Sequence, residues 1–200
     1  MASAVVLDGS WWSAFSSFVW QGILHILFGF DHVLFVICLA LAATSRAGLV
    51  WMITGFSVGH SVTLIAGFLG VRPEGAWFIT WVEILIALSI LYAAWAAHRE
   101  RAGTGLVTAL IGLLHGFGFS FVLGEILGAS SESLIASLLA FNVGVELGQL
   151  AIIVVFLSAL ALLERLQPTW VSKVRASILA TIACIAGYWV VERLWIGLAS

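Results

Sequence analysis

The chain has 200 residues, of which 62% are hydrophobic and only 9% are charged, and its formal net charge at pH 7 is −2. Soluble globular domains carry about 25% charged residues. This composition, with a mean hydropathy of +1.17, therefore excludes an ordinary soluble domain and indicates an integral membrane protein. The few basic residues form no patch typical of nucleic-acid binding, so membrane lipids rather than nucleic acid are the expected surroundings.

Six apolar runs, each long enough to cross a bilayer, follow a more polar amino-terminal segment. Residues 1–17 are too polar to span, and their Trp and Phe side chains predict an interfacial segment. The six predicted membrane helices cover residues 18–43, 49–69, 76–97, 105–127, 134–163 and 177–198. Because their connections are short, neighbours in sequence are expected to be antiparallel neighbours in space. The sequence thus predicts an all-α, polytopic membrane protein, a bundle of six transmembrane helices forming one domain over residues 18–200.

Basic residues are distributed unequally between the two sides of this predicted bundle. Most of them fall in the first, third and fifth connections, namely Arg46, Arg99, Arg101, Arg165, Lys173 and Arg175. Only Arg72 and Arg193 fall on the opposite side. Cytoplasmic loops of membrane proteins carry an excess of Lys and Arg. The asymmetry therefore predicts that both termini lie outside the cytoplasm.

Polar and ionisable side chains occur at middle or outer depth in five of the six predicted helices. They are His25, Asp31, His32, His60, Glu83, His115, Glu125, Asn142 and Glu146. An ionisable group inside a membrane is costly and marks a functional site by default. For Asn142 taken alone, structural hydrogen bonding between helices is the favoured interpretation. Four His and three carboxylates at overlapping depth, however, favour a metal or proton site, and mixed imidazole and carboxylate ligands suit Ni²⁺, Co²⁺ or Zn²⁺ better than Cu⁺.

The spacing of the two His in the first predicted helix limits how they could act. His25 and His32 are seven residues apart, so they share a helix face but are separated by roughly 10.5 Å along a straight axis. A metal–nitrogen bond is only about 2.0–2.1 Å long. Either Gly29 breaks the helix, or the two His form successive stations. Asp31 could ligate a metal directly, or it could orient an imidazole.

Several motifs occur in the order found in a known family. His25, Asp31 and His32, followed by Val-Leu-Phe, resemble the first-helix signature of the HupE/UreJ family of hydrogenase and urease accessory membrane proteins. Further matches are GHSVTL at 59–64, VEILIALS at 82–89, LLHGFGF at 113–119 and FNVGVELGQ at 141–149. The resemblance covers roughly residues 22–149. One departure is that the second motif has a single His, His115, with Glu125 ten residues later.

This resemblance implies a permease of the bacterial inner (cytoplasmic) membrane for nickel, or alternatively cobalt, that supplies metal to nickel enzymes. The ligand types leave zinc as a further alternative. The resemblance places His25, Asp31, His32, His115 and Glu125 on the metal path. Two other functions stay open from the residues alone. One is an intramembrane zinc hydrolase with Asp31 or Glu146 as base. The other is a metal-binding sensor or assembly factor without flux. A homo-oligomer is a further open alternative.

Overall fold

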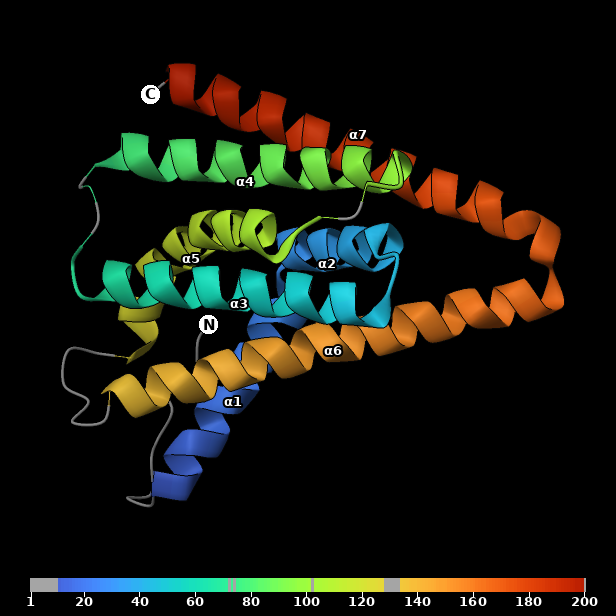
Figure 1. Cartoon of the computed structure of the whole chain (residues 1–200). Coiled ribbons are helices and arrows are strands. Elements are labelled where there is room, and N and C mark those ends of the chain that lie inside the picture. Colours follow the sequence, from blue (N-terminus) through green and yellow to red (C-terminus); the bar gives the residue numbers. More distant parts are fainter. Residues whose placement is uncertain (1–10, 72, 74, 102, 128–133, 200) are drawn as a thin grey trace.

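The protein is a bundle of α-helices in the computed structural model, which describes residues 11–71, 73, 75–101, 103–127 and 134–199. The helices of this described part are α1 (Trp11–Phe28), α2 (Phe30–Ala42), α3 (Arg46–Phe68), α4 (Ala76–His98), α5 (Gly105–Leu127), α6 (Leu134–Leu166) and α7 (Val171–Ala199) (Figure 1). A short 3₁₀ turn, η1 (Pro168–Trp170), joins α6 to α7. The predicted all-α class is thereby confirmed.

Length and composition identify the helices that could cross a membrane. Within the described residues, α3, α4, α6 and α7 each qualify alone, and α1 with α2 qualifies as a pair bent by 77°. This gives four membrane-crossing candidates, or up to five with the bent pair as one. In α5 the apolar stretch with described side chains, Gly105–Ser120, falls short of the required length. The protein is therefore a multi-pass membrane protein, while six crossings and outside termini stay predictions.

The first predicted membrane helix, residues 18–43, is divided into two helices in the structure. Gly29 separates α1 from α2 with an extended backbone (φ −79°, ψ 94°), and the chain turns sharply there. The helix α1 begins at Trp11, upstream of the boundary expected at residue 17, and residues 1–10 lie outside the described part. The interfacial position of residues 1–17 is untested and stays a prediction.

Glycines allow the helices α3 and α5 to pack at short range. A methyl group at Gly59 of α3 would strike the backbone carbonyl of Ala109, and one at Gly112 of α5 would strike the carbonyl of Phe56. Helix interfaces in membranes are enriched in small residues because these let two backbones approach closely. The same level of the bundle carries His60 on α3 and His115 on α5, so the close approach brings two polar side chains into the interior.

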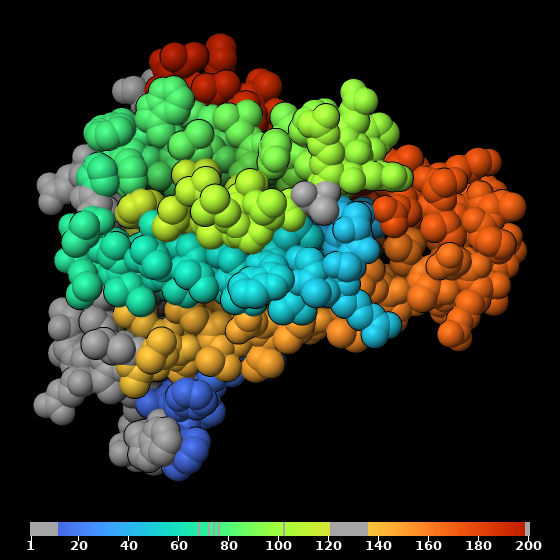
Figure 2. All heavy atoms as spheres, viewed as in Figure 1, coloured from blue at the N-terminus to red at the C-terminus, as the bar shows by residue number. Residues whose placement is uncertain are grey.

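The connections alternate between the two ends of the bundle. The α2–α3, α4–α5 and α6–α7 connections lie at one end, and the carboxyl terminus lies at the other (Figure 1). The helix α7 packs mainly on α4, on the outside of the bundle. The hairpin of α6 and α7, drawn in orange, projects beyond the ends of the other helices (Figure 2). Six of the basic residues named above therefore gather at a single end.

Candidate metal centre

Three histidines from three different helices meet in the interior of the bundle. His25 lies in the last turn of α1, His32 in the first turn of α2, and His60 in α3. Each can offer a ring nitrogen, and these nitrogen atoms all lie within 4.8 Å of one another. The ring centroids of His25 and His32 are 4.6 Å apart, and those of His25 and His60 are 5.7 Å apart. The break at Gly29 therefore replaces the long separation of a straight helix by direct contact.

Asp31 fixes the orientation of the His32 ring. Its Oδ1 lies 3.0 Å from Nδ1 of His32 and also accepts a hydrogen bond of 3.0 Å from the His32 backbone N–H. Asp31 stands in the first turn of α2, where the positive end of the helix dipole favours a carboxylate. A carboxylate oxygen only accepts, so Nδ1 of His32 carries the proton and Nε2 keeps its lone pair. Metal-binding His side chains are held in this way by a carboxylate or carbonyl.

A fourth imidazole, that of His115 on α5, lies beside this group. Its ring centroid is 5.1 Å from that of His32. Nδ1 of His115 is 3.1 Å from the backbone oxygen of Ile111, and a carbonyl oxygen also only accepts. His115 therefore presents Nε2 in the same manner as His32. The aromatic rings of Phe35 and Phe56 pack against His115, with centroids at 5.6 and 5.1 Å, and enclose it in apolar surroundings.

The interior is unusual because many of its polar atoms have no hydrogen-bond partner among the described residues. The buried atoms concerned are His25 Nε2, His32 Nε2, His60 Nδ1 and Nε2, His115 Nε2, Asn142 Oδ1 and Gln149 Nε2. Buried polar atoms are normally paired, and leaving one unpaired costs about 1–3 kcal/mol. Five of these atoms are imidazole nitrogens in neighbouring rings. A metal ion would satisfy several of them together, since neutral imidazole is a good ligand for first-row transition metals.

Residues of α3, α5 and α6 complete the walls around the His group. The Phe119 ring lies 3.8 Å from that of His25, centroid to centroid, and Phe141 lies at 5.5 Å. Ser57 donates a 3.0 Å hydrogen bond to Oε1 of Gln149, which joins α3 to α6 within the interior. The Phe rings were not singled out from the sequence, although Phe119 ends the motif at 113–119 and Phe141 begins the motif at 141–149. Their role here is to keep water from the imidazoles.

The other residues expected on a metal path lie in different surroundings, except Asn142, whose unpaired Oδ1 belongs to the interior described above. Glu83 is exposed on α4, where its Oε2 is 3.8 Å from Nε of Arg193 on α7 and its backbone carbonyl accepts a hydrogen bond from the same guanidinium. Asn142 donates a 2.8 Å hydrogen bond to the Leu138 carbonyl on its own helix. Glu146 is half-buried on α6. The backbone of Glu125 belongs to α5, but its side chain lies outside the described part.

The arrangement thus brings together the four buried or half-buried His of the sequence motifs and Asp31, and it leaves Glu83 apart from them. A sequence model of the family described as "HupE / UreJ protein" matches residues 2–193 of the chain. Comparisons with curated proteins and with solved structures give no match. The match extends over nearly the whole chain, so the protein belongs to the HupE/UreJ family, and the resemblance noted in the sequence motifs is confirmed.

Proposed function

We propose that this HupE/UreJ protein is a membrane permease for a divalent transition metal, with nickel as the first candidate and cobalt or zinc as alternatives. The observation that carries the proposal is the convergence of His25, His32 and His60 with unpaired ring nitrogens inside a membrane bundle. The family resemblance supports it, because the motifs that carry the resemblance contain all three of these His. The metal is the transported substrate, held for the time that it resides in the bundle.

The spacing of the ring nitrogens supports binding of one ion by all three His. Bonds of about 2.1 Å allow two ligands of one ion to lie at most about 4.2 Å apart. The nitrogen atoms of the three rings lie within 4.8 Å of one another. Displacements of these nitrogen atoms by less than about 1 Å would therefore complete the coordination. Asp31 and Nδ1 of His32 keep one ligand oriented before the metal arrives.

A permease must release its substrate as well as bind it. Transport requires sites that are weak or multiple, so that an ion can leave for the next site. His115 lies within 5.1 Å of His32, ring centroid to ring centroid, and offers such a second position. We infer that the ion passes from the three-His site towards His115, because the two share His32 as a neighbour. The carboxylate of Glu83 would attract cations at the surface before they reach the His.

The proposal is tested by metal uptake into cells that express the protein. Replacing His60 by Ala removes one of the three ligands, and uptake of nickel, cobalt and zinc is expected to fall to the level of cells without the protein. The control is Val58→Ala, which removes an exposed apolar side chain from the same helix. Both variants must accumulate in the membrane at the wild-type level. Undiminished uptake in His60→Ala would overturn the proposal.

A zinc hydrolase and a sensor without flux remain the competing functions. Three His can hold zinc with a fourth position open for water, which is the arrangement of catalytic zinc sites. Reconstitution of the purified protein in liposomes separates these functions from transport. Accumulation of metal in the lumen supports the permease. Zinc that stays bound in stoichiometric amounts, without accumulation in the lumen, supports the hydrolase or the sensor instead.

A further inference from the structure

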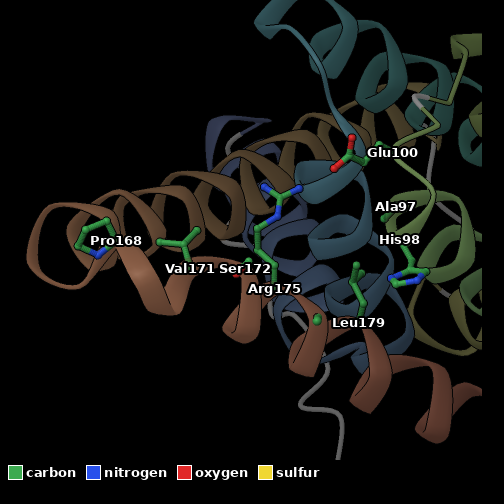
Figure 3. Close-up of a pocket in the computed structure, with 9 residues that line it drawn as sticks. Ala97, His98, Glu100, Pro168, Val171, Ser172, Arg175 and Leu179 are labelled. Carbon is green, nitrogen blue, oxygen red and sulfur yellow. The ribbon is translucent and has the colours of Figure 1, made fainter.

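A second site of a different kind lies at the end of the bundle that carries most of the basic residues. A cavity of about 440 Å³ opens between the end of α4 and the beginning of α7. Its polar lining residues are His98 and Glu100 from α4 and the turn after it, and Ser172 and Arg175 from α7 (Figure 3). This volume falls in the range of ligand-binding cavities. None of these residues takes part in the His group described above.

Arg175 is the principal cation of this cavity. One of its terminal nitrogens, Nη2, donates a 3.0 Å hydrogen bond to the carbonyl oxygen of Leu41 at the end of α2. This bond anchors the half-buried guanidinium and leaves it several further N–H donors, since a guanidinium has five. Figure 3 shows the Arg175 side chain extending away from α7 towards the side on which Glu100 lies. A planar guanidinium with free donors is well suited to bind a phosphate group.

An apolar groove continues from the polar cavity along the same two helices. The groove has a volume of about 490 Å³ and shares three lining residues with the cavity, His98, Ala176 and Leu179. Beyond them it is lined by Leu91, Ala94, Trp95, Ala180 and Ala183. On α7 three of the lining residues are Ala176, Ala180 and Ala183, whose small side chains leave space against α4. A polar cavity at the helix ends is thus followed by an apolar groove that runs along α4 and α7.

We propose that the cavity and the groove together form a binding site for a phospholipid with a primary amine in its headgroup. The phosphate binds Arg175 and Ser172, the ammonium group binds the carboxylate of Glu100, and an acyl chain lies in the groove. The order of these parts matches a lipid whose headgroup lies at the end of the helices. The charges match as well, because the cavity offers one guanidinium and one carboxylate to a headgroup with one phosphate and one ammonium.

The test is native mass spectrometry of the full-length protein in mild detergent, titrated with phosphatidylethanolamine. Arg175→Gln is expected to weaken binding by about tenfold or more, as expected for loss of charge-assisted hydrogen bonds. The matched control is Lys173→Gln, which removes the same charge two residues away, where the ammonium group lies 5.2 Å from the Trp170 ring centroid. Retention of binding in Arg175→Gln, or an equal loss in Lys173→Gln, would overturn the site.

Two further variants keep the proposal testable if the loss of the bond to Leu41 destabilises Arg175→Gln. Ala180→Phe fills the groove without changing a charge, and its control is Thr181→Phe, on an exposed position of the same helix. The first is expected to displace the lipid and the second to retain it. Glu100→Gln is expected to abolish the preference for phosphatidylethanolamine over phosphatidylglycerol. Equal binding of both lipids by the wild type, or displacement of the lipid by millimolar inorganic phosphate, contradicts the proposal.

Discussion

At the scale of single residues, the chemistry of the site depends on which ring nitrogens are already engaged. The carboxylate of Asp31 holds Nδ1 of His32, and the carbonyl of Ile111 holds Nδ1 of His115. Both rings are therefore fixed in the tautomer that presents Nε2. His60 differs, because neither of its nitrogens has a partner among the described residues. The four-His group thus contains two imidazoles oriented by hydrogen bonds, those of His32 and His115, and one, that of His60, which a metal alone would fix.

The role of Asp31 can be measured with the variant Asp31→Asn. The amide keeps the shape of the side chain but loses its negative charge, so it no longer stabilises the proton on Nδ1 of His32. Loss of such a partner typically weakens metal binding by about 10–100-fold. We expect this loss in calorimetric titrations of the purified protein with Ni²⁺, Co²⁺ and Zn²⁺. The control is Glu164→Gln, an exposed carboxylate on α6, and wild-type affinity in Asp31→Asn would show that the hydrogen bond does not serve the metal.

The types of residue in the site were predictable from the sequence, but their directions were not. Depth along a helix follows from counting residues, and it placed His60, His115 and Asp31 at one level. The direction of a side chain around the helix axis depends on which other helices pack against its helix. Glu83 lies on α4 at suitable depth, yet its carboxylate points to Arg193 on α7. An almost wholly apolar helix has no distinct polar face, so its sequence does not predict which side faces the interior of the bundle.

At the scale of the helices, the decisive element is the break between α1 and α2. The sequence left two alternatives for His25 and His32, a broken helix or two separate stations. A single Gly is tolerated in membrane helices, so Gly29 alone did not decide between them. In the structure the two His rings meet because α2 turns away by 77°. Discontinuous helices recur in transporters, where their ends face the substrate.

The break can be tested by adding a single methyl group. A Cβ atom at Gly29 would lie 2.7 Å from the His25 carbonyl oxygen and 2.8 Å from Nδ1 of His32. Gly29→Ala should therefore separate His32 from Asp31 and weaken metal binding by about tenfold or more, comparable to the loss of a ligand-orienting partner. The matched control is Gly187→Ala on α7, where the added methyl meets no described atom within 4 Å. Equal affinities in the two variants would show that the break tolerates a side chain and that its geometry does not set the site.

At the scale of the whole molecule, the arrangement of connections bears on how often the chain crosses the membrane. Counting α1 and α2 as one bent crossing, the helices α3 to α7 add five more if α5 also crosses. The helix α5 has 23 residues, which corresponds to about 34 Å and exceeds a hydrocarbon core of about 30 Å. Six crossings would explain why the basic connections all lie at one end and the carboxyl terminus at the other (Figure 1).

Reporter fusions in a bacterial host distinguish six crossings from five. Alkaline phosphatase needs disulfides and is active only outside the cytoplasm, whereas green fluorescent protein fluoresces inside. With six crossings and the basic end in the cytoplasm, fusion after Ser200 should give active phosphatase and no fluorescence. Fusion after Arg101, in the α4–α5 connection, should give the reverse.

The two fusions control for each other, because each reporter must be active at one of the two positions and inactive at the other. Fluorescence after both residues would mean that an even number of crossings separates Arg101 from Ser200, as when α5 turns back within the bundle and only α6 and α7 cross. The α6–α7 connection with its basic residues would then lie outside the cytoplasm, against the usual distribution of Lys and Arg, and His115 would lie on a re-entrant helix.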